Sequence, residues 1–288
     1  MLTLIADSGS TKTDWALTGI DPSPRRVSAA TRFHTQGINP IHQSDNEIRQ
    51  IIHQELLPYL SIENISHVYF YGSGVRPEKE APMAQLLREM FSCAEVVEAH
   101  SDLLGAARAL CGHSYGIASI LGTGANSCLY DGKNILQHTP ALGYILGDEG
   151  SGAVLGKLLV GDVLKKQIPQ HLCDKFMKEY NLDYTTIITS VYRKPAANRF
   201  LAQFAPFLEH NIDEPSIHNI VLRSFTDFFT RNVASYPNYK ELPCNFVGSI
   251  ALCEKNVLQE AAQALGITIG TIMKDPMEGL IKYHSTTE

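Results

Sequence analysis

A short segment near the amino terminus, D-S-G-S-T-K-T, places an aspartate, a glycine, a lysine and several hydroxyl side chains directly after the apolar run L-T-L-I-A. Backbone amides in a turn between two strands can surround an anion, and a glycine lets a phosphate approach closely. Asp7 fits such a site if Mg²⁺ lies between its carboxylate and the phosphates. The segment therefore predicts a nucleotide-phosphate turn, formed by Asp7, Ser8, Gly9, Ser10, Thr11, Lys12 and Thr13. The alternative is a plain hairpin with an exposed polar turn, and the Walker A pattern is absent.

Two further small-residue turns could complete a nucleotide site. The segment L-G-T-G-A-N-S (residues 121–127) supplies Gly122, Thr123 and Gly124, which we expect to form a second phosphate turn. The segment N-F-V-G-S-I-A (245–251) supplies Gly248 and Ser249 between a strand and a helix. There the small residues would admit a flat base or a ribose, and a helix amino terminus favours negative charge. An ordinary hairpin and an ordinary strand–helix corner are the alternatives.

Two acidic positions follow elements of regular structure. Asp102 comes after Ser101, where a strand ends and a helix begins. It could be a base, or simply an acid that is favourable near a helix amino terminus. Asp148 and Glu149 are adjacent in G-Y-I-L-G-D-E-G-S-G (143–152). Because neighbouring side chains do not normally face one site, we expect only Asp148 to face a ligand.

The elements that must position these residues follow from periodicity and turn signals. Up to about residue 105 the pattern is β-β-β-α-β-α-β-α, with strands expected at 2–7, 14–18, 27–34, 67–71 and 95–99 and helices opened by Ser44 and Ser101. Strand, G-T-G-A-N turn and strand recur from Gly116, a faint internal repeat of the amino-terminal plan. Residues 148–236 read as mostly helical, 243–272 as strand–helix–strand, and a last helix begins at Pro276. This pattern predicts an α/β protein with mixed sheets.

In the order of its three turns, the chain resembles the superfamily of sugar kinases, heat-shock chaperones and actin. Within it, the segment at 143–152 resembles the G-W-x-x-G-D-E-G-S motif of the N-acetylglucosamine kinase and BadF/BadG/BcrA/BcrD ATPase family. Tyr144 stands in place of the usual tryptophan, and Ser249 in place of a second glycine. The resemblance implies two similar domains of the actin-like ATPase (ribonuclease H-like) fold, each a mixed β-sheet flanked by helices, with the active site in the cleft between them. We expect domains at 1–112 and 113–288, the second with a helical insertion at about 149–240.

The same resemblance implies the activity and the roles of residues. It implies transfer of the γ-phosphoryl group of ATP to a hydroxyl, the 6-OH, of N-acetylglucosamine or a related amino sugar, with Mg²⁺ held by Asp7 through water. Asp102 falls where the family's catalytic aspartate lies. The sugar-binding residues implied are Asn39, Ser73, Asp102, Thr123, Gly143, Tyr144 and Asp148.

Composition narrows the classes of partner. The net charge is −6 and basic runs are absent, which argues against nucleic acid. Residues 109–130 contain no Asp, Glu, Lys or Arg, but their glycines, Asn126 and Ser127 predict a core strand and turn rather than a membrane span. A signal-peptide pattern is absent, so we expect a cytoplasmic protein with free thiols. The sequence leaves open whether the protein forms a homodimer.

Two other functions stay open beside the kinase. A dehydratase-activating ATPase of the same family would need cysteines that hold an iron–sulfur cluster, and the six cysteines here lack that spacing. A protein that senses sugar or nucleotide without turnover is the other, against which Asp7, Lys12 and Asp102 argue.

Overall fold

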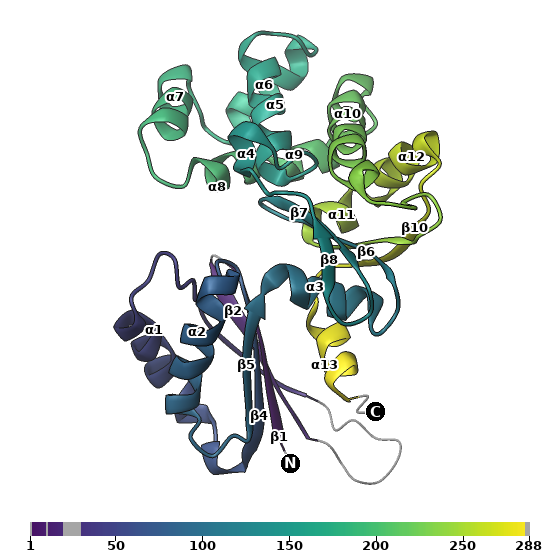
Figure 1. Ribbon diagram of the computed structural model, residues 1–288. Coiled ribbons are helices and arrows are strands. Elements are labelled where there is room, and N and C mark those ends of the chain that lie inside the picture. The colour runs from purple at the N-terminus through teal and green to yellow at the C-terminus, as the bar shows by residue number, and fades with distance from the viewer. Residues whose placement is uncertain (1, 10, 20–29, 286–288) are drawn as a thin grey trace. The chain divides into compact units, whose positions relative to one another are not determined.

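The computed structural model describes residues 2–9, 11–19 and 30–285, which divide into two compact units (Figure 1). The first unit consists of Met1–Ser114, Gly132–Asn134 and Pro276–Glu288, and the second of Tyr115–Asp131 and Ile135–Asp275. The change of unit near residue 114 lies close to the predicted boundary. The last helix differs from the prediction, because it belongs to the first unit.

The first unit is built on a mixed sheet of five described strands in the order β3-β2-β1-β4-β5. These are β1 (Leu2–Ser8), β2 (Lys12–Gly19), β3 (Thr31–Gln36), β4 (Ile65–Gly72) and β5 (Val96–Ser101). β1 is antiparallel to β2 and parallel to β4, which is parallel to β5. β3 is antiparallel to β2, so β1, β3, β4 and β5 all run in one direction. The part of the third strand predicted at residues 27–29 lies outside the described residues.

Helices cover both faces of this sheet. They are α1 (Asp45–Ile51), which continues through single turns at Ile52–Leu56 and Leu57–Tyr59, then Ile62–Asn64, α2 (Pro77–Met90), α3 (Asp102–Cys111) and α13 (Met277–Ser285). Ser44 and Glu47 form the predicted capping box of α1. The core between the sheet and α1 and α2 contains the fully buried Trp15 and Phe70, whereas Ile5 and Leu280 pack on the opposite face.

The reason that α13 joins the first unit lies in its contact with α3. A Cβ atom at Gly279 would overlap the backbone of Ala109, so the two helices approach closely at that glycine. The His284 ring of α13 also stacks on Tyr69 of β4, with ring centroids 3.7 Å apart. Both contacts are tertiary, which is why the sequence pattern could not assign this helix to a unit.

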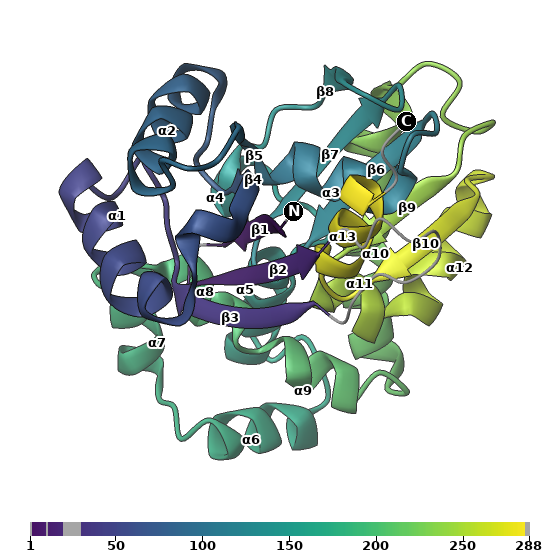
Figure 2. The same ribbon diagram turned by 90° about the horizontal axis from the view of Figure 1, so that it is seen from below.

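The second unit repeats the strand order of the first (Figure 2). Read from the edge that corresponds to β3, its order is β8-β7-β6-β9-β10. Its described strands are β6 (Gly116–Leu121), β7 (Ala125–Tyr130), β8 (Ile135–His138), β9 (Cys244–Val247) and β10 (Ile269–Met273). β6 is antiparallel to β7 and parallel to β9, and β9 is parallel to β10. The internal repeat predicted from the two glycine turns is therefore present as two sheets of the same topology.

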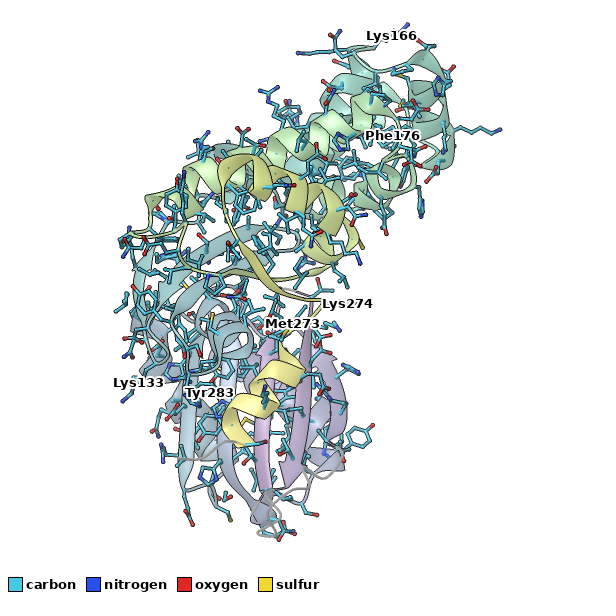
Figure 3. The ribbon with its side chains drawn as sticks, turned by 90° about the vertical axis from the view of Figure 1, so that its right-hand side faces the viewer. Lys133, Lys166, Phe176, Met273, Lys274 and Tyr283 are labelled. Carbon is cyan, nitrogen blue, oxygen red and sulfur yellow. The ribbon has the colours of Figure 1, made fainter. Side chains whose placement is uncertain are left out.

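A helical segment separates β8 from β9, and two helices separate β9 from β10. The helices are α4 (Gly143–Leu146), α5 (Gly152–Leu164), α6 (Gln170–Glu179), α7 (Tyr184–Tyr192), α8 (Ala197–Ala202), α9 (Ala205–His210), α10 (Pro215–Arg231), the turn Val233–Ser235, α11 (Ser249–Cys253) and α12 (Lys255–Leu265). Phe176, labelled in Figure 3, packs edge-on against Phe204 and Phe207 inside the helical segment.

The two mixed sheets flanked by helices confirm the predicted actin-like α/β fold. Among the helices of the described residues, none combines the length and the hydropathy of a membrane span.

Candidate functional site

In the first unit, the predicted site residues meet at one edge of the sheet. Because β1, β3, β4 and β5 run in the same direction, their carboxyl ends share this edge. Ser8 ends β1, the segment Gly37–Asn39 follows β3, Ser73 follows β4 and Asp102 follows β5. The structure thus brings four separate segments of the predicted site together.

The turn between β1 and β2 is tied down by buried hydroxyls. The Oγ of Ser8 lies 2.6 Å from Oγ1 of Thr13, and the amide of Ile38 donates to both oxygens at 3.0 and 3.2 Å. Ser8 and Thr13 are fully buried. Their hydroxyls therefore hold the turn to the segment after β3, which differs from the expected contact of the Thr13 hydroxyl with phosphate.

The outer part of the same turn is open to solvent. Gly9, Thr11 and Lys12 are exposed, and the Gly9 amide donates to the Lys12 carbonyl at 3.0 Å. Ser10, which was predicted to bind nucleotide, lies outside the described residues. The exposed backbone is the part of the turn that could meet a phosphate.

A second carboxylate stands beside Asp7. In the antiparallel pairing of β1 and β2, Asp7 lies directly opposite Asp14, so both point to the same face of the sheet. Asp14 forms an ion pair with Lys12 at 2.8 Å and a short hydrogen bond with His34 of β3. Asp14 was not predicted as a site residue, although the predicted hairpin of strands 2–7 and 14–18 already implied this pairing.

The loops after β3 and β4 contact each other through Asn39. Gly74 has a φ of +83°, and a Cβ atom there would overlap the Asn39 side chain. The Oδ1 atom of Asn39 accepts a hydrogen bond from the Ile41 amide at 2.9 Å, and the Ser73 amide donates to the Ser8 carbonyl at 2.8 Å. Gly74 thus packs directly on a predicted site residue, which sequence reasoning did not single out, although Y-G-S-G was visible as a turn.

Asp102 is the first residue of α3 and is half-buried. Ser101 caps the helix by accepting a hydrogen bond from the Leu104 amide at 3.2 Å, so Asp102 is not needed for that cap. Burial raises the pKa of the Asp102 carboxyl, and hydrogen bonds from backbone amides oppose this rise. No ion pair to Asp102 is present within the described residues. A carboxylate with a raised pKa is a stronger base than an ordinary one.

The second unit has the equivalent edge, formed by the carboxyl ends of β6, β9 and β10. Gly122, Thr123 and Gly124 form the turn after β6, and Gly248 follows β9. Gly248 has a φ of +129°, and a Cβ atom there would overlap the carbonyl group of Leu121. The turn after β6 and the turn after β9 therefore touch through their backbones.

Asp148 lies against the first of these turns. A Cβ atom added to Gly124 would lie 3.0 Å from its Oδ2 atom. Burial raises the pKa of the Asp148 carboxyl, while hydrogen bonds from the backbone of Ala125 and Gly143 lower it. Glu149 instead forms an ion pair with Arg231 at 2.9 Å. The adjacent acids have different partners.

The other predicted residues of this motif lie beside Asp148. Gly143 is exposed with a φ of +73°, and Tyr144 is half-buried against the core of the second unit. The Nζ atom of Lys157 donates to the Tyr144 carbonyl at 2.6 Å, which holds α4 to α5.

A cavity of about 250 Å³ opens next to the glycine turns of the second unit. Gly122, Thr123 and Ser249 line it from the sheet edge, and helices α5, α8, α9 and α11 supply the remaining wall. Its wall combines apolar side chains with a few polar groups, as the walls of small-ligand pockets do.

Comparison with known proteins gives two informative matches. A solved structure from Porphyromonas gingivalis, of a provisionally assigned N-acetylglucosamine kinase, is 48% identical in sequence, with 99% of each chain covered and a TM-score of 0.91. A second, of a protein from Chromobacterium violaceum with the same provisional assignment, is 18% identical over 98% of each chain with a TM-score of 0.69, and it shows the fold alone. No family model and no curated protein matches the chain.

Proposed function

We propose a reaction for this chain from its membership in the N-acetylglucosamine kinase family, to which it belongs: transfer of the γ-phosphoryl group of ATP to the 6-OH of N-acetylglucosamine or a closely related amino sugar. The observation that carries the proposal is the 48% identity along 99% of the chain to a protein with that assignment. The site geometry in each unit supports it.

Asp102 is proposed as the general base. It lies at the carboxyl edge of the first sheet, and its carboxyl has a raised pKa caused by burial. It would orient the sugar hydroxyl and accept its proton as the phosphoryl group transfers. Phosphoryl transfer depends mostly on positioning and charge neutralisation, so one well-placed base and a set of phosphate contacts are sufficient machinery.

Each unit offers one turn that we propose as a phosphate contact, with Gly9, Thr11 and Lys12 in the first unit and Gly122, Thr123 and Gly124 in the second. Within the described residues no group of three or more His, Cys, Asp or Glu side chains forms a metal cage. This fits Mg²⁺, which keeps several waters and uses one or two carboxylates with phosphate oxygens. Asp7 would hold the ion through water, and the ion would neutralise phosphate charge.

Candidate sugar-binding residues lie in each unit. Asn39 and Ser73 lie at the same sheet edge as Asp102. In the second unit Asp148 faces the turn at Gly124, next to which Thr123 lies, and Gly143 and Tyr144 precede Asp148 in the same motif. Asp148, whose neighbour Glu149 is paired with Arg231, would accept a hydrogen bond from a sugar hydroxyl.

A screen of amino sugars with ATP and Mg²⁺ tests the proposal. The assay reads ADP release and, by mass spectrometry, the phosphorylated sugar, and it includes N-acetylglucosamine, N-acetylmannosamine and glucosamine. We expect sugar-dependent ADP release and a 6-phosphate product. ATP binding without turnover of any amino sugar would contradict the kinase proposal.

A further inference from the structure

The helix after β9 breaks at one buried acid. The run A-L-C-E-K-N-V-L-Q-E-A-A-Q-A-L-G reads as one continuous helix, but the structure has α11 ending at Cys253 and α12 starting at Lys255. Glu254 lies at the break, with a φ of −100° and a ψ of 27°. Glu254 is only 5% exposed, yet it lines the cavity beside the glycine turns of the second unit.

The Glu254 carboxyl lacks a protein partner. No hydrogen bond or ion pair to its oxygens exists within the residues that the structure describes. The charged group that faces it is Glu209 of α9, which also lines the cavity and accepts a hydrogen bond from Cys253. Two lysines lie nearby in the chain or in space. The charge of Lys274, labelled in Figure 3 after β10, lowers the pKa of the Cys253 thiol, and Lys255 follows Glu254 as the first residue of α12. The Glu254 oxygens are not among the fully buried, unpartnered side-chain atoms of the described residues, so the carboxyl opens into the cavity, where a ligand can take up its hydrogen bonds.

The surroundings of Glu254 keep part of it neutral at physiological pH. Burial, and then the negative charge of Glu209, raise the pKa of Glu254 to about 7. A neutral carboxylic acid has one O–H donor beside one acceptor, whereas a carboxylate can only accept. Adenine presents the complementary pair, since its exocyclic amino group donates and a neighbouring ring nitrogen accepts.

We propose that Glu254, in its neutral form, recognises the adenine base of ATP in this cavity through two hydrogen bonds and thereby sets nucleotide affinity and its pH dependence. The acid donates to a ring nitrogen of the base and accepts from the exocyclic amino group. This inference rests on the proposed kinase function, because it takes ATP as the occupant of the cavity. The small residues Gly122 and Ser249 of the same wall leave room for the nucleotide.

Binding of MgADP tests the proposal without turnover. If only the neutral acid binds adenine, the protein must take up a proton on binding wherever Glu254 is ionised in the free protein. Calorimetry in two buffers of different ionisation enthalpy should show uptake of about one proton per MgADP at pH 8 and almost none at pH 6. Glu254→Gln, whose amide keeps a donor and an acceptor, should bind MgADP without this uptake. Equal uptake by the parent and the variant would overturn the proposal.

Kinetics give an independent measurement. The KM for MgATP of the parent should rise about tenfold from pH 6 to pH 8, since each pH unit above the pKa of Glu254 removes tenfold of the neutral form. The ratio of parent to Glu254→Gln isolates this effect, because ATP and Asp102 titrate equally in both proteins. Glu209→Gln should move the rise in KM to lower pH by lowering the pKa of Glu254. Parallel profiles for all three proteins would contradict the proposal.

The outcomes separate the two proposals. If the parent binds neither MgADP nor MgATP, the kinase function itself fails. If it phosphorylates an amino sugar but Glu254→Gln changes neither proton uptake nor the pH profile of KM, the kinase stands and the role of Glu254 is wrong. Circular dichroism of both variants shows that each one folds.

Discussion

The turns that follow β1 and β6 occupy equivalent places in two sheets of the same strand order, but they are held in different ways. The first is fixed by side chains, since the buried hydroxyls of Ser8 and Thr13 tie it to Ile38. The second is fixed by backbone approach, because Gly248 packs against the carbonyl of Leu121. One topology thus supports two chemistries: the first unit presents carboxylates at its edge, and the second presents glycine turns beside a cavity.

The largest expected effect concerns the carboxylates of the first unit. Asp102→Asn keeps the shape of the side chain but removes the base, so kcat should fall by a factor of about 10²–10⁴ while sugar still binds. Steady-state kinetics with N-acetylglucosamine measure this. Ser101→Ala is the matched control, because it removes the cap of α3, costs about 1 kcal/mol of stability and leaves kcat largely intact. Near-parental turnover by Asp102→Asn would refute the assignment of the base.

The same variant should be more stable than the parent at neutral pH. Burial raises the pKa of Asp102 above its unfolded value, so the folded state binds the proton more tightly than the unfolded state. The stability of the parent therefore falls as the pH rises from about 3.9 through the folded pKa, and the neutral asparagine does not share this loss. Thermal unfolding at pH 7 and pH 3.5 should show a gap in Tm that narrows at the lower pH. A gap that does not change with pH would show that ionisation is not its cause.

The next effect concerns the stability that the glycine turns of the second unit require. Gly248→Ala should cost at least about 1–3 kcal/mol of stability, because its backbone conformation is nearly restricted to glycine and its Cβ atom would overlap Leu121. Gly122→Ala is the matched control: a Cβ atom there meets nothing within 4 Å, so Tm should stay close to that of the parent. Equal melting temperatures for the two variants would contradict the backbone account.

Much of the fold that carries these turns could be predicted from the sequence. The strands of both sheets, the capping box at Ser44 and the start of α3 after Ser101 follow from local patterns, and the structure has them. The repeated strand–turn–strand plan correctly predicted two similar sheets. Local patterns carry these features because period, capping and turn chemistry act within a few residues.

The features that sequence reasoning missed depend on contacts between distant segments. The break at Glu254 is invisible in a run of good helix formers, and Gly74 matters only because Asn39 packs on it. The burial of the Thr13 hydroxyl depends on Ile38 of another segment. Propensity cannot encode such contacts, since tertiary packing overrides it.

An effect of similar size, on substrate binding instead of stability, is expected from the acid beside the second turn. Asp148→Asn removes a charged acceptor, so we expect KM for the sugar to rise by roughly 10–150-fold, the equivalent of about 1.5–3 kcal/mol, with a smaller change in kcat. Glu149→Gln is the matched control, because Glu149 is paired with Arg231 and should affect KM little. A kcat loss as large as that of Asp102→Asn would place Asp148 in the chemical step instead.

The smallest effect compares one threonine hydroxyl at the first turn with one in the second. Thr13 is fully buried and its hydroxyl lies 2.6 Å from that of Ser8, whereas Thr123 of the second turn is exposed. Thr13→Val keeps the volume but loses the hydrogen bonds, so it should lower the free energy of unfolding by about 1 kcal/mol. Thr123→Val should change it by less than about 0.5 kcal/mol, as is usual for exposed positions. Urea unfolding of both variants measures the difference, and equal losses would mean that buried hydroxyls do not hold the first turn.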